Sequence, residues 1–111
     1  MRTMRKVQAV IYDIKNGKPY FLIFHRILHW RGWELSKETI EKGETIKQAL
    51  KRGVKEETGL KNFKIVKSLN KRIEFMWGKI KVVIVEVFLV KVDMKEKIRL
   101  RIEKIVKKLL N

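Results

Sequence analysis

Two short segments near the start of the chain, Val7–Ile14 and Pro19–Phe24, are rich in the apolar and aromatic residues that favour β-strands. Asn16-Gly17 lies between them, and this dipeptide is typical of the tight turn in a two-residue hairpin. The sequence therefore predicts that the chain opens with an antiparallel pair of strands.

Three further strands are predicted in the second half of the chain. They are Phe63–Leu69 and then a hairpin of Arg72–Trp77 and Lys79–Val90 that turns at Gly78. From Ile80 to Val90 the last strand is apolar at both alternating sets of positions, apart from Lys81 and Glu86. A strand of this kind has both faces covered, which predicts helices on either side of a sheet.

Between these strand regions the spacing of apolar residues lengthens to that of a helix. Its apolar stripe repeats at i, i+4 and i+8: Ile46, Leu50 and Val54. Thr45 and Gln48 have the spacing of a capping box, in which the hydroxyl accepts from an early helix N–H and the amide reaches back. Gly59 is placed to end the helix in the left-handed conformation.

A second helical pattern covers Asp93–Leu110. The residues of its apolar stripe are Ile98, Ile102, Ile105 and Leu109. A basic row adjoins this stripe: Lys97, Arg101, Lys104 and Lys108. Such a row can meet phosphates, although solvated lysines on an outer helix are the commoner explanation.

The carboxylates are concentrated in one part of a basic chain. The net charge is +16, yet the segment from Glu34 to Leu60 holds six of the twelve acidic residues. Glu57 projects close to the apolar stripe of the first helix, and Glu56 lies beside it near the C-terminal end, where the helix dipole disfavours negative charge. A carboxylate on a buried stripe needs a cation, a metal or several donors, and a salt bridge to Arg52 or Lys55 is the alternative to a metal.

The segment from Glu38 to Leu60 resembles the signature of the Nudix superfamily, G-x5-E-x7-R-E-U-x-E-E-x-G-U, in which U is aliphatic. Seven of the nine defined positions match in register: Glu44, Arg52, Val54, Glu56, Glu57, Gly59 and Leu60. The preceding GWELSKE is similar to the W-x-F-P-K-G that leads into this signature, and it keeps Trp33 and Lys37.

Two positions depart from the signature. Glu38 replaces its first glycine, where the backbone of Nudix proteins approaches the metal closely, and Gly53 replaces the first glutamate of its core. In the superfamily that glutamate often serves as a metal ligand or as the base for the attacking water, and Gly53 can do neither. A glycine there allows close contact between helix and sheet, at a cost of about 1 kcal/mol relative to alanine.

The resemblance implies an α/β fold, namely the Nudix-type α/β/α sandwich with a mixed β-sheet between the two predicted helices. It also implies a hydrolase, here a slow one, that cleaves the diphosphate of a nucleoside diphosphate linked to another moiety. Mg²⁺ or Mn²⁺ would bind Glu56 and Glu57, which are the first catalytic candidates. Glu86 is the third, because Nudix proteins often take one acid from outside the signature; a solvated rim is the alternative place for it.

Other residues receive supporting roles from the same resemblance. Glu44 and Arg52 would form the ion pair that braces the signature, and Lys37 would hold substrate charge. Arg26, which follows a predicted strand, is a further candidate to bind substrate, and Trp30 lies in the next loop, where an indole could stack a nucleobase. Trp33 is expected to pack in the core instead.

The length of 111 residues and the hydrophobic content of 45% predict one domain over residues 1–111. No apolar run reaches the length of a membrane span, so a cytoplasmic location is the default expectation. The absence of cysteine excludes disulfides and leaves the redox compartment undecided. Two other functions compete with the hydrolase. One is a catalytically impaired Nudix-fold protein that binds RNA, nucleotide or a ribonucleoprotein surface, and the other is a basic structural subunit.

Overall fold

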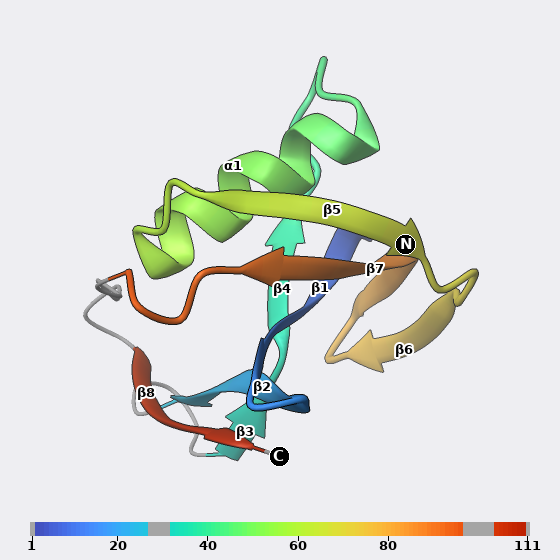
Figure 1. Ribbon diagram of the computed structural model, residues 1–111. Helices are drawn as coiled ribbons and strands as arrows, with labels where there is room; N and C mark the ends of the chain where they lie inside the picture. Colours follow the sequence, from blue (N-terminus) through green and yellow to red (C-terminus); the bar gives the residue numbers. More distant parts are fainter. Residues whose placement is uncertain (1, 27–31, 97–103, 111) are drawn as a thin grey trace.

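A computed structural model describes residues 2–26 and 32–96 and the backbone of 104–110. These residues form eight strands and one helix (Figure 1). In chain order the elements are β1 (Arg2–Lys15), β2 (Lys18–Arg26), β3 (Gly32–Glu34), β4 (Ser36–Thr39), α1 (Ile46–Thr58), β5 (Phe63–Ser68), β6 (Ile73–Trp77), β7 (Ile80–Val92) and β8 (Lys104–Leu110).

All eight strands belong to one mixed sheet, whose main path has the order β3-β2-β1-β7-β5. The β1–β7 pair is parallel, and the remaining pairs are antiparallel. β1 changes partner along its length, because Lys6–Ala9 pair with β4 and Ile11–Lys15 pair with β2. This change of partner lets β4 lie against one half of β1 directly before the chain enters α1.

The ends of α1 follow the sequence prediction. The Thr45 hydroxyl accepts from the Gln48 backbone N–H at 3.1 Å, and the Gln48 side chain accepts from the Thr45 N–H at 2.9 Å. Gly59 ends the helix with φ +73°, a conformation that costs a residue with a side chain about 1–2 kcal/mol. The helix is therefore fixed by its local sequence at both ends.

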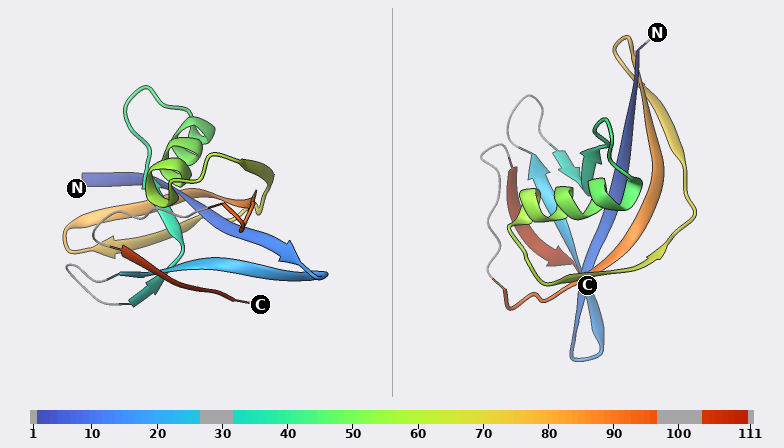
Figure 2. Two further views of the ribbon diagram at one scale, coloured as in Figure 1. Left: turned by 60° about the vertical axis from the view of Figure 1, so that its left-hand side comes forward. Right: turned by 90° about the horizontal axis from the view of Figure 1, so that it is seen from above.

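The hydrophobic core lies between α1 and one face of the sheet (Figures 1 and 2). It consists of Val7, Ala9, Ile11, Leu22, Phe24, Ala49, Leu50, Val54, Leu60, Phe88, Val90 and Val92. Leu50 and Val54 from the predicted stripe are at most 2% exposed, and Ile46 packs partly buried at the edge of the core. Within the described ranges, no helix has the length and apolar character needed to cross a bilayer.

Both predicted hairpins are confirmed. Asn16 and Gly17 take positive φ values of 53° and 75°, which two-residue hairpins require, and Gly78 turns the second hairpin with φ +61°. The strand predicted over Phe63–Leu69 is β5, which ends at Ser68. In the middle of β7, residues that project to either face of the sheet are buried, as predicted.

The predicted C-terminal helix over Asp93–Leu110 is wrong for the part that the structure describes. Residues 104–110 form β8, which pairs antiparallel with β2 and is the red strand in Figure 1. Ile105 and Val106 are β-branched and suit a strand, and pairing gives partners to the backbone groups along an edge of β2. Long-range pairing therefore overrides the helical period of the local sequence.

This correction has two consequences. Lys97 and Arg101 of the predicted basic row lie outside the described residues, and Lys104 and Lys108 belong to a strand, so the row has no helical face. The mixed α/β Nudix-type fold is confirmed, but the second helical layer of the sandwich is not found among the described residues, where α1 alone is helical.

Candidate active site

Arg52 on α1 is the centre of the site, and Glu44 in the loop before the helix is its strongest partner. The Nε of Arg52 donates to Glu44 Oε2 at 2.7 Å, and its Nη2 donates to Glu44 Oε1 at 2.8 Å. Nη2 also donates to the Thr39 carbonyl at 2.7 Å. The side chains are only 21% and 18% exposed. The guanidinium thus ties α1 both to the preceding loop and to β4.

This pair controls the protonation of both partners. The hydrogen bonds from Arg52, and then the backbone N–H of Glu41, lower the pKa of Glu44 to about 2. The same contact with Glu44, followed by that with Glu38, raises the pKa of Arg52 above its ordinary value. Glu44 is therefore ionised at neutral pH. The predicted brace of the signature is present in the structure.

Two other carboxylates approach the Nη1 of Arg52. Glu38 Oε1, from β4, lies 3.2 Å away, and Glu56 Oε2, from the next turn of α1, lies 3.5 Å away. Glu41 is at the limit of contact at 3.8 Å, and its side chain is 65% exposed. One guanidinium therefore faces Glu38, Glu44 and Glu56 together. The negative charge is locally in excess in a chain of net charge +16.

Glu57 lies on the side of α1 that faces the sheet, within the core. Its side chain belongs to the set of fully buried large side chains, with a residue exposure of 1%. The prediction that it shares the apolar face is confirmed. Glu56 is different, because its side chain is 47% exposed. The two neighbouring acids thus differ sharply in access to solvent.

Glu86 lies on the face of the sheet that α1 covers. Val7 of β1 is opposite Glu38 of β4 and also opposite Glu86 of β7. Opposite residues in adjacent strands project to the same face, and Val7 belongs to the core under α1. Glu86 is half-buried there. Glu38, Val7 and Glu86 form one row across this face of the sheet.

The close approach of β4 to α1 explains the glycine at residue 53. A Cβ added to Gly53 would lie 2.6 Å from the Cβ and 2.7 Å from the Cγ of Glu38, and 3.2 Å from its Oε2. Carbon atoms cannot approach so closely without a shift of the backbone. The sequence prediction that a glycine here allows close contact between helix and sheet is confirmed.

The residues predicted to bind substrate are not gathered around this cluster. Lys37 alternates with Glu38 along β4 and so projects to the opposite face, where its Nζ lies 3.9 Å from Glu34 and 5.7 Å from the ring centre of Phe75. Arg26 ends β2 and pairs through its backbone with Gly32, but only its backbone is described. Trp30 lies outside the described residues.

Trp33 does not pack in the core, contrary to expectation. It is 50% exposed and stacks on His25 with 4.7 Å between ring centres. β3 is a strand of three residues, Gly32–Glu34, and it places the indole on the surface beside β2.

Two features of the structure were not singled out from the sequence. One is β6, in which Ile73, Phe75, Met76 and Trp77 are all at least 40% exposed. The signal was the run of apolar residues within a segment flanked by lysine and arginine. The other is the contact between Glu38 and Gly53, for which the signal was that both departures from the signature exchange a glycine and a glutamate.

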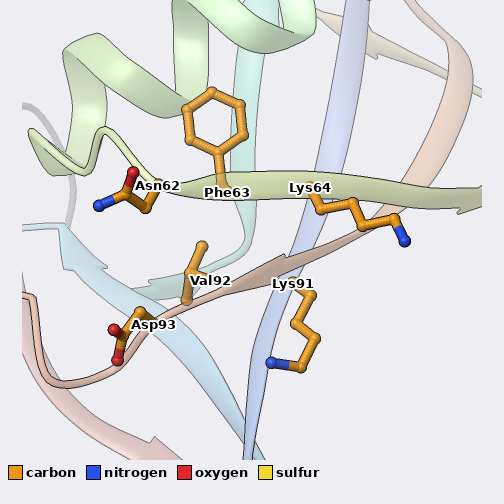
Figure 3. A pocket seen from close by; sticks show the side chains of 6 residues that line it. All are labelled: Asn62, Phe63, Lys64, Lys91, Val92 and Asp93. Carbon is orange, nitrogen blue, oxygen red and sulfur yellow. The ribbon is translucent and has the colours of Figure 1, made fainter.

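An open hollow of about 400 Å³ lies elsewhere, between the start of β5 and the end of β7 (Figure 3). Its lining residues are Asn62, Phe63, Lys64, Lys91, Val92 and Asp93. Lys91 donates to Asp13 at 3.1 Å, and Asp13 also accepts from the backbone of Met94 at 2.7 Å. None of the residues predicted for the site lines this hollow, and its contacts join the end of β7 to β1.

Among the described residues, no three His, Asp or Glu side chains converge closely enough to hold a metal ion. Arg52 occupies the space between Glu38, Glu44 and Glu56. The donors nevertheless have the right chemistry, since carboxylate oxygens are the ligands that Mg²⁺ and Mn²⁺ prefer.

Fold and site together define an α/β protein in which carboxylates gather around an arginine of the helix that covers a mixed sheet. The family model described as the NUDIX domain matches residues 2–105, so the chain belongs to the Nudix family. Among curated protein sequences, none matches the chain.

Three solved structures illustrate the similarity of fold. An Ap4A hydrolase from C. elegans, in a binary complex, has a TM-score of 0.81 and 22% identity, with 95% of this chain and 78% of that chain covered. The MutT protein from Methanosarcina mazei Go1 has a TM-score of 0.76 and 24% identity, covering 94% and 73%. A NUDIX hydrolase from Nitrosomonas europaea has a TM-score of 0.72 and 22% identity, covering 98% and 72%. At these identities the likeness shows the fold alone.

Proposed function

We propose that the protein is a metal-dependent Nudix hydrolase that cleaves the diphosphate of a nucleoside diphosphate linked to another moiety. The observation that carries this proposal is the cluster of carboxylates around Arg52, which concentrates negative charge on α1 of a strongly basic protein. A cation at this cluster would balance the excess, and the basic surroundings would attract a polyanionic substrate.

Glu56 and Glu57 would hold the Mg²⁺ or Mn²⁺. Glu56 is open to solvent and to a phosphate chain that approaches from it, whereas Glu57 faces the sheet side of α1. A divalent cation bound there would neutralise the phosphate oxygens and lower the pKa of a coordinated water. Glu44 would keep Arg52 in place, so that Glu56 is held at the start of the last helical turn.

The reaction is a displacement at phosphorus by water. The water oxygen forms a bond to one phosphorus, the bridging P–O bond breaks, and the leaving phosphate takes the electron pair of that bond. The proton of the water passes to a carboxylate, for which Glu86 is a candidate because it lies on the face beneath α1. Arg26 and Trp30 stay predicted contacts of the nucleotide part of the substrate.

A substrate panel tests this proposal. Purified protein with Mg²⁺ or Mn²⁺ is incubated with nucleoside di- and triphosphates, capped RNA and dinucleoside polyphosphates; the last are included because one structure of similar fold is an Ap4A hydrolase. We expect hydrolysis of at least one substrate that depends on the metal. Glu56→Gln and Glu57→Gln should each lower the rate by about 10²-fold or more. No turnover of any substrate would contradict the proposal.

A second candidate function, binding of single-stranded RNA, is favoured by β6. Phe75 and Trp77 alternate onto one face of this strand and are 40% and 64% exposed. Lys37 lies over the Phe75 ring, and four more basic residues flank the strand: Lys71, Arg72, Lys79 and Lys81. Exposed aromatic rings among basic side chains are the usual platform on which bases stack.

Fluorescence anisotropy with a short labelled RNA tests this second candidate. Stacking contributes about 1–3 kcal/mol per base, so Trp77→Ala should weaken binding by about 5-fold or more. Trp33→Ala is the matched control, because that indole is also half-exposed but lies on β3. Equal affinities for the wild type and Trp77→Ala would remove β6 from the interaction.

A further inference from the structure

The two departures from the Nudix signature touch each other in the folded protein. The signature has glycine first and glutamate at the start of its core, whereas this chain has Glu38 and Gly53 at those positions. Fourteen residues separate them in the sequence, and the packing of β4 against α1 brings them into contact. The chain therefore keeps one carboxylate and one glycine between the two positions, with their places exchanged.

The contact is a steric interlock. Glu38 fills the volume into which a side chain at residue 53 would project, because its Cβ and Cγ lie within 2.7 Å of the place of that missing Cβ. Its Oε2 lies 3.2 Å from the same place. The side chain of Glu38, which projects from β4, thus occupies the space that a side chain at residue 53 of α1 would need.

The carboxylate of Glu38 is also directed toward the proposed metal ligands. Its Oε1 contacts Arg52 Nη1 at 3.2 Å, the same nitrogen that Glu56 contacts at 3.5 Å. Gly53 lies one helical turn before Glu57, so Glu38 meets α1 on the side from which Glu57 projects. The Glu38 side chain is 14% exposed, which holds its acid group at the boundary between core and solvent.

We infer that Glu38 supplies, from β4, the carboxylate that the signature places at residue 53 of the helix, and that it is a ligand of the divalent cation. The inference rests on the proposed function, since it adds a ligand to that site. It gives a reason for both departures at once: glutamate at 38 requires glycine at 53, and glycine at 53 requires an acid from elsewhere.

Thermal unfolding tests the interlock without any metal. Alanine in place of glycine within a helix normally stabilises. Here Gly53→Ala should instead lower Tm by about 4 °C or more, because the added methyl group collides with Glu38. In the Glu38→Gly background the same Gly53→Ala change should raise Tm. A rise in both backgrounds would show that Glu38 does not fill this space and would overturn the inference.

Titration calorimetry with Mn²⁺ tests whether the carboxylate of Glu38 takes the place of one at residue 53 as a metal ligand. Glu38→Gln should weaken Mn²⁺ binding by about 10-fold or more. Glu41→Gln is the matched control, because Glu41 carries the same charge and approaches the same arginine but is largely exposed. Glu38→Gly should bind Mn²⁺ weakly, and Glu38→Gly combined with Gly53→Glu should return the affinity to near the wild-type value.

The outcomes separate this inference from the proposed function. If the wild type binds Mn²⁺ and Glu38→Gln binds it equally well, the inference fails while the metal-dependent hydrolase stands. If the wild type and every variant bind no Mn²⁺, the proposed function fails and the ligand assignment fails with it. Recovery of binding in the combined variant, after its loss in Glu38→Gly, would support the exchange.

Discussion

Charged side chains have opposite environments in two regions of the molecule. One region is the interface between α1 and β4, and the other is the exposed strand β6. At the interface Arg52 contacts Glu38, Glu44 and Glu56, and the side chains of Arg52 and Glu44 are about four-fifths buried. On β6 the ion pair of Arg72 and Glu74 has side chains 60% and 43% exposed. In the first region the ion pairs hold packed elements together, whereas in the second the charged side chains lie in solvent.

The difference in burial between the two regions predicts how each responds to substitution and what each can bind. A buried cluster with more carboxylates than cations is sensitive to any loss of positive charge, and it is suited to recruiting a metal ion. An exposed strand of apolar and aromatic residues with basic residues on either side contributes little to stability and is suited to contact with a partner. Matched substitutions in the two regions should therefore differ strongly in their effects.

Among the charged side chains of the two regions, loss of the central arginine should have the largest effect. Removing one partner of a fully buried ion pair costs about 3–5 kcal/mol. Because the Arg52 side chain is 21% exposed, we expect Arg52→Ala to lower the free energy of unfolding by about 2–3 kcal/mol. Arg72→Ala on the exposed pair should cost about 0.5 kcal/mol or less. Urea denaturation measures both.

Divalent cations sharpen this first comparison. Mg²⁺ should restore part of the stability of Arg52→Ala, because a cation can replace the lost positive charge among the three carboxylates. It should leave the stability of Arg72→Ala unchanged. If the two arginine variants lose equal stability, the interface is not the electrostatic centre described here.

Acid should cost the interface more stability than it costs β6. The folded pKa of Glu44, about 2, lies below its ordinary value of 4.5. Its contribution to stability is therefore fully present above about pH 4.5 and is lost as the pH falls toward 2. Denaturant unfolding measured across this range should show a smaller loss in Glu44→Gln than in the wild type.

Glu74 provides the comparison for this pH prediction. Hydrogen bonds from Lys81 and then Arg72 lower its pKa as well, so its contribution has the same sign. Because both partners are exposed, Glu74→Gln should change the acid dependence less than Glu44→Gln does. Identical acid profiles for the wild type and Glu44→Gln would contradict the assignment.

The parts of the fold that could be predicted are those specified by neighbours in the sequence. Asn16-Gly17 determines a hairpin, and Thr45, Gln48 and Gly59 determine the ends of α1, because each interaction closes over a few residues. The contact between Arg52 and Glu44 could be expected for a similar reason, and from the resemblance to the signature. Long-range choices could not be predicted in this way.

Two features of the structure depend on such long-range interactions. They are the strand β8 and the contact between Glu38 and Gly53. Apolar residues of 104–110 suit a helix or a strand, and the edge of β2 decides between them. The sequence shows a glutamate and a glycine out of place, but only the packing of β4 under α1 shows that one fills the space left by the other. Because of the same packing, Gly53→Glu alone is not expected to restore a site, since its side chain would meet Glu38.

A smaller effect is expected at the start of α1. Thr45→Ala removes the hydroxyl that accepts from the Gln48 N–H and should cost about 1 kcal/mol. Thr45→Ser keeps the hydroxyl and should retain most of the stability, as measured by urea denaturation. A full loss in Thr45→Ser would show that the methyl group, and not the capping hydrogen bond, stabilises this helix end.

The smallest effect on stability is expected on β6. The Trp77 indole is 64% exposed and lies at an end of its strand, so Trp77→Ala should change the free energy of unfolding by less than about 0.5 kcal/mol. Leu50→Ala, in the core beneath α1, should cost about 2–5 kcal/mol under the same conditions. A near-zero cost at Trp77 together with weaker RNA binding would assign this aromatic side chain to a partner. A large loss of stability would instead show that the indole packs against the fold, and the contrast between the two regions would be reduced to their ion pairs.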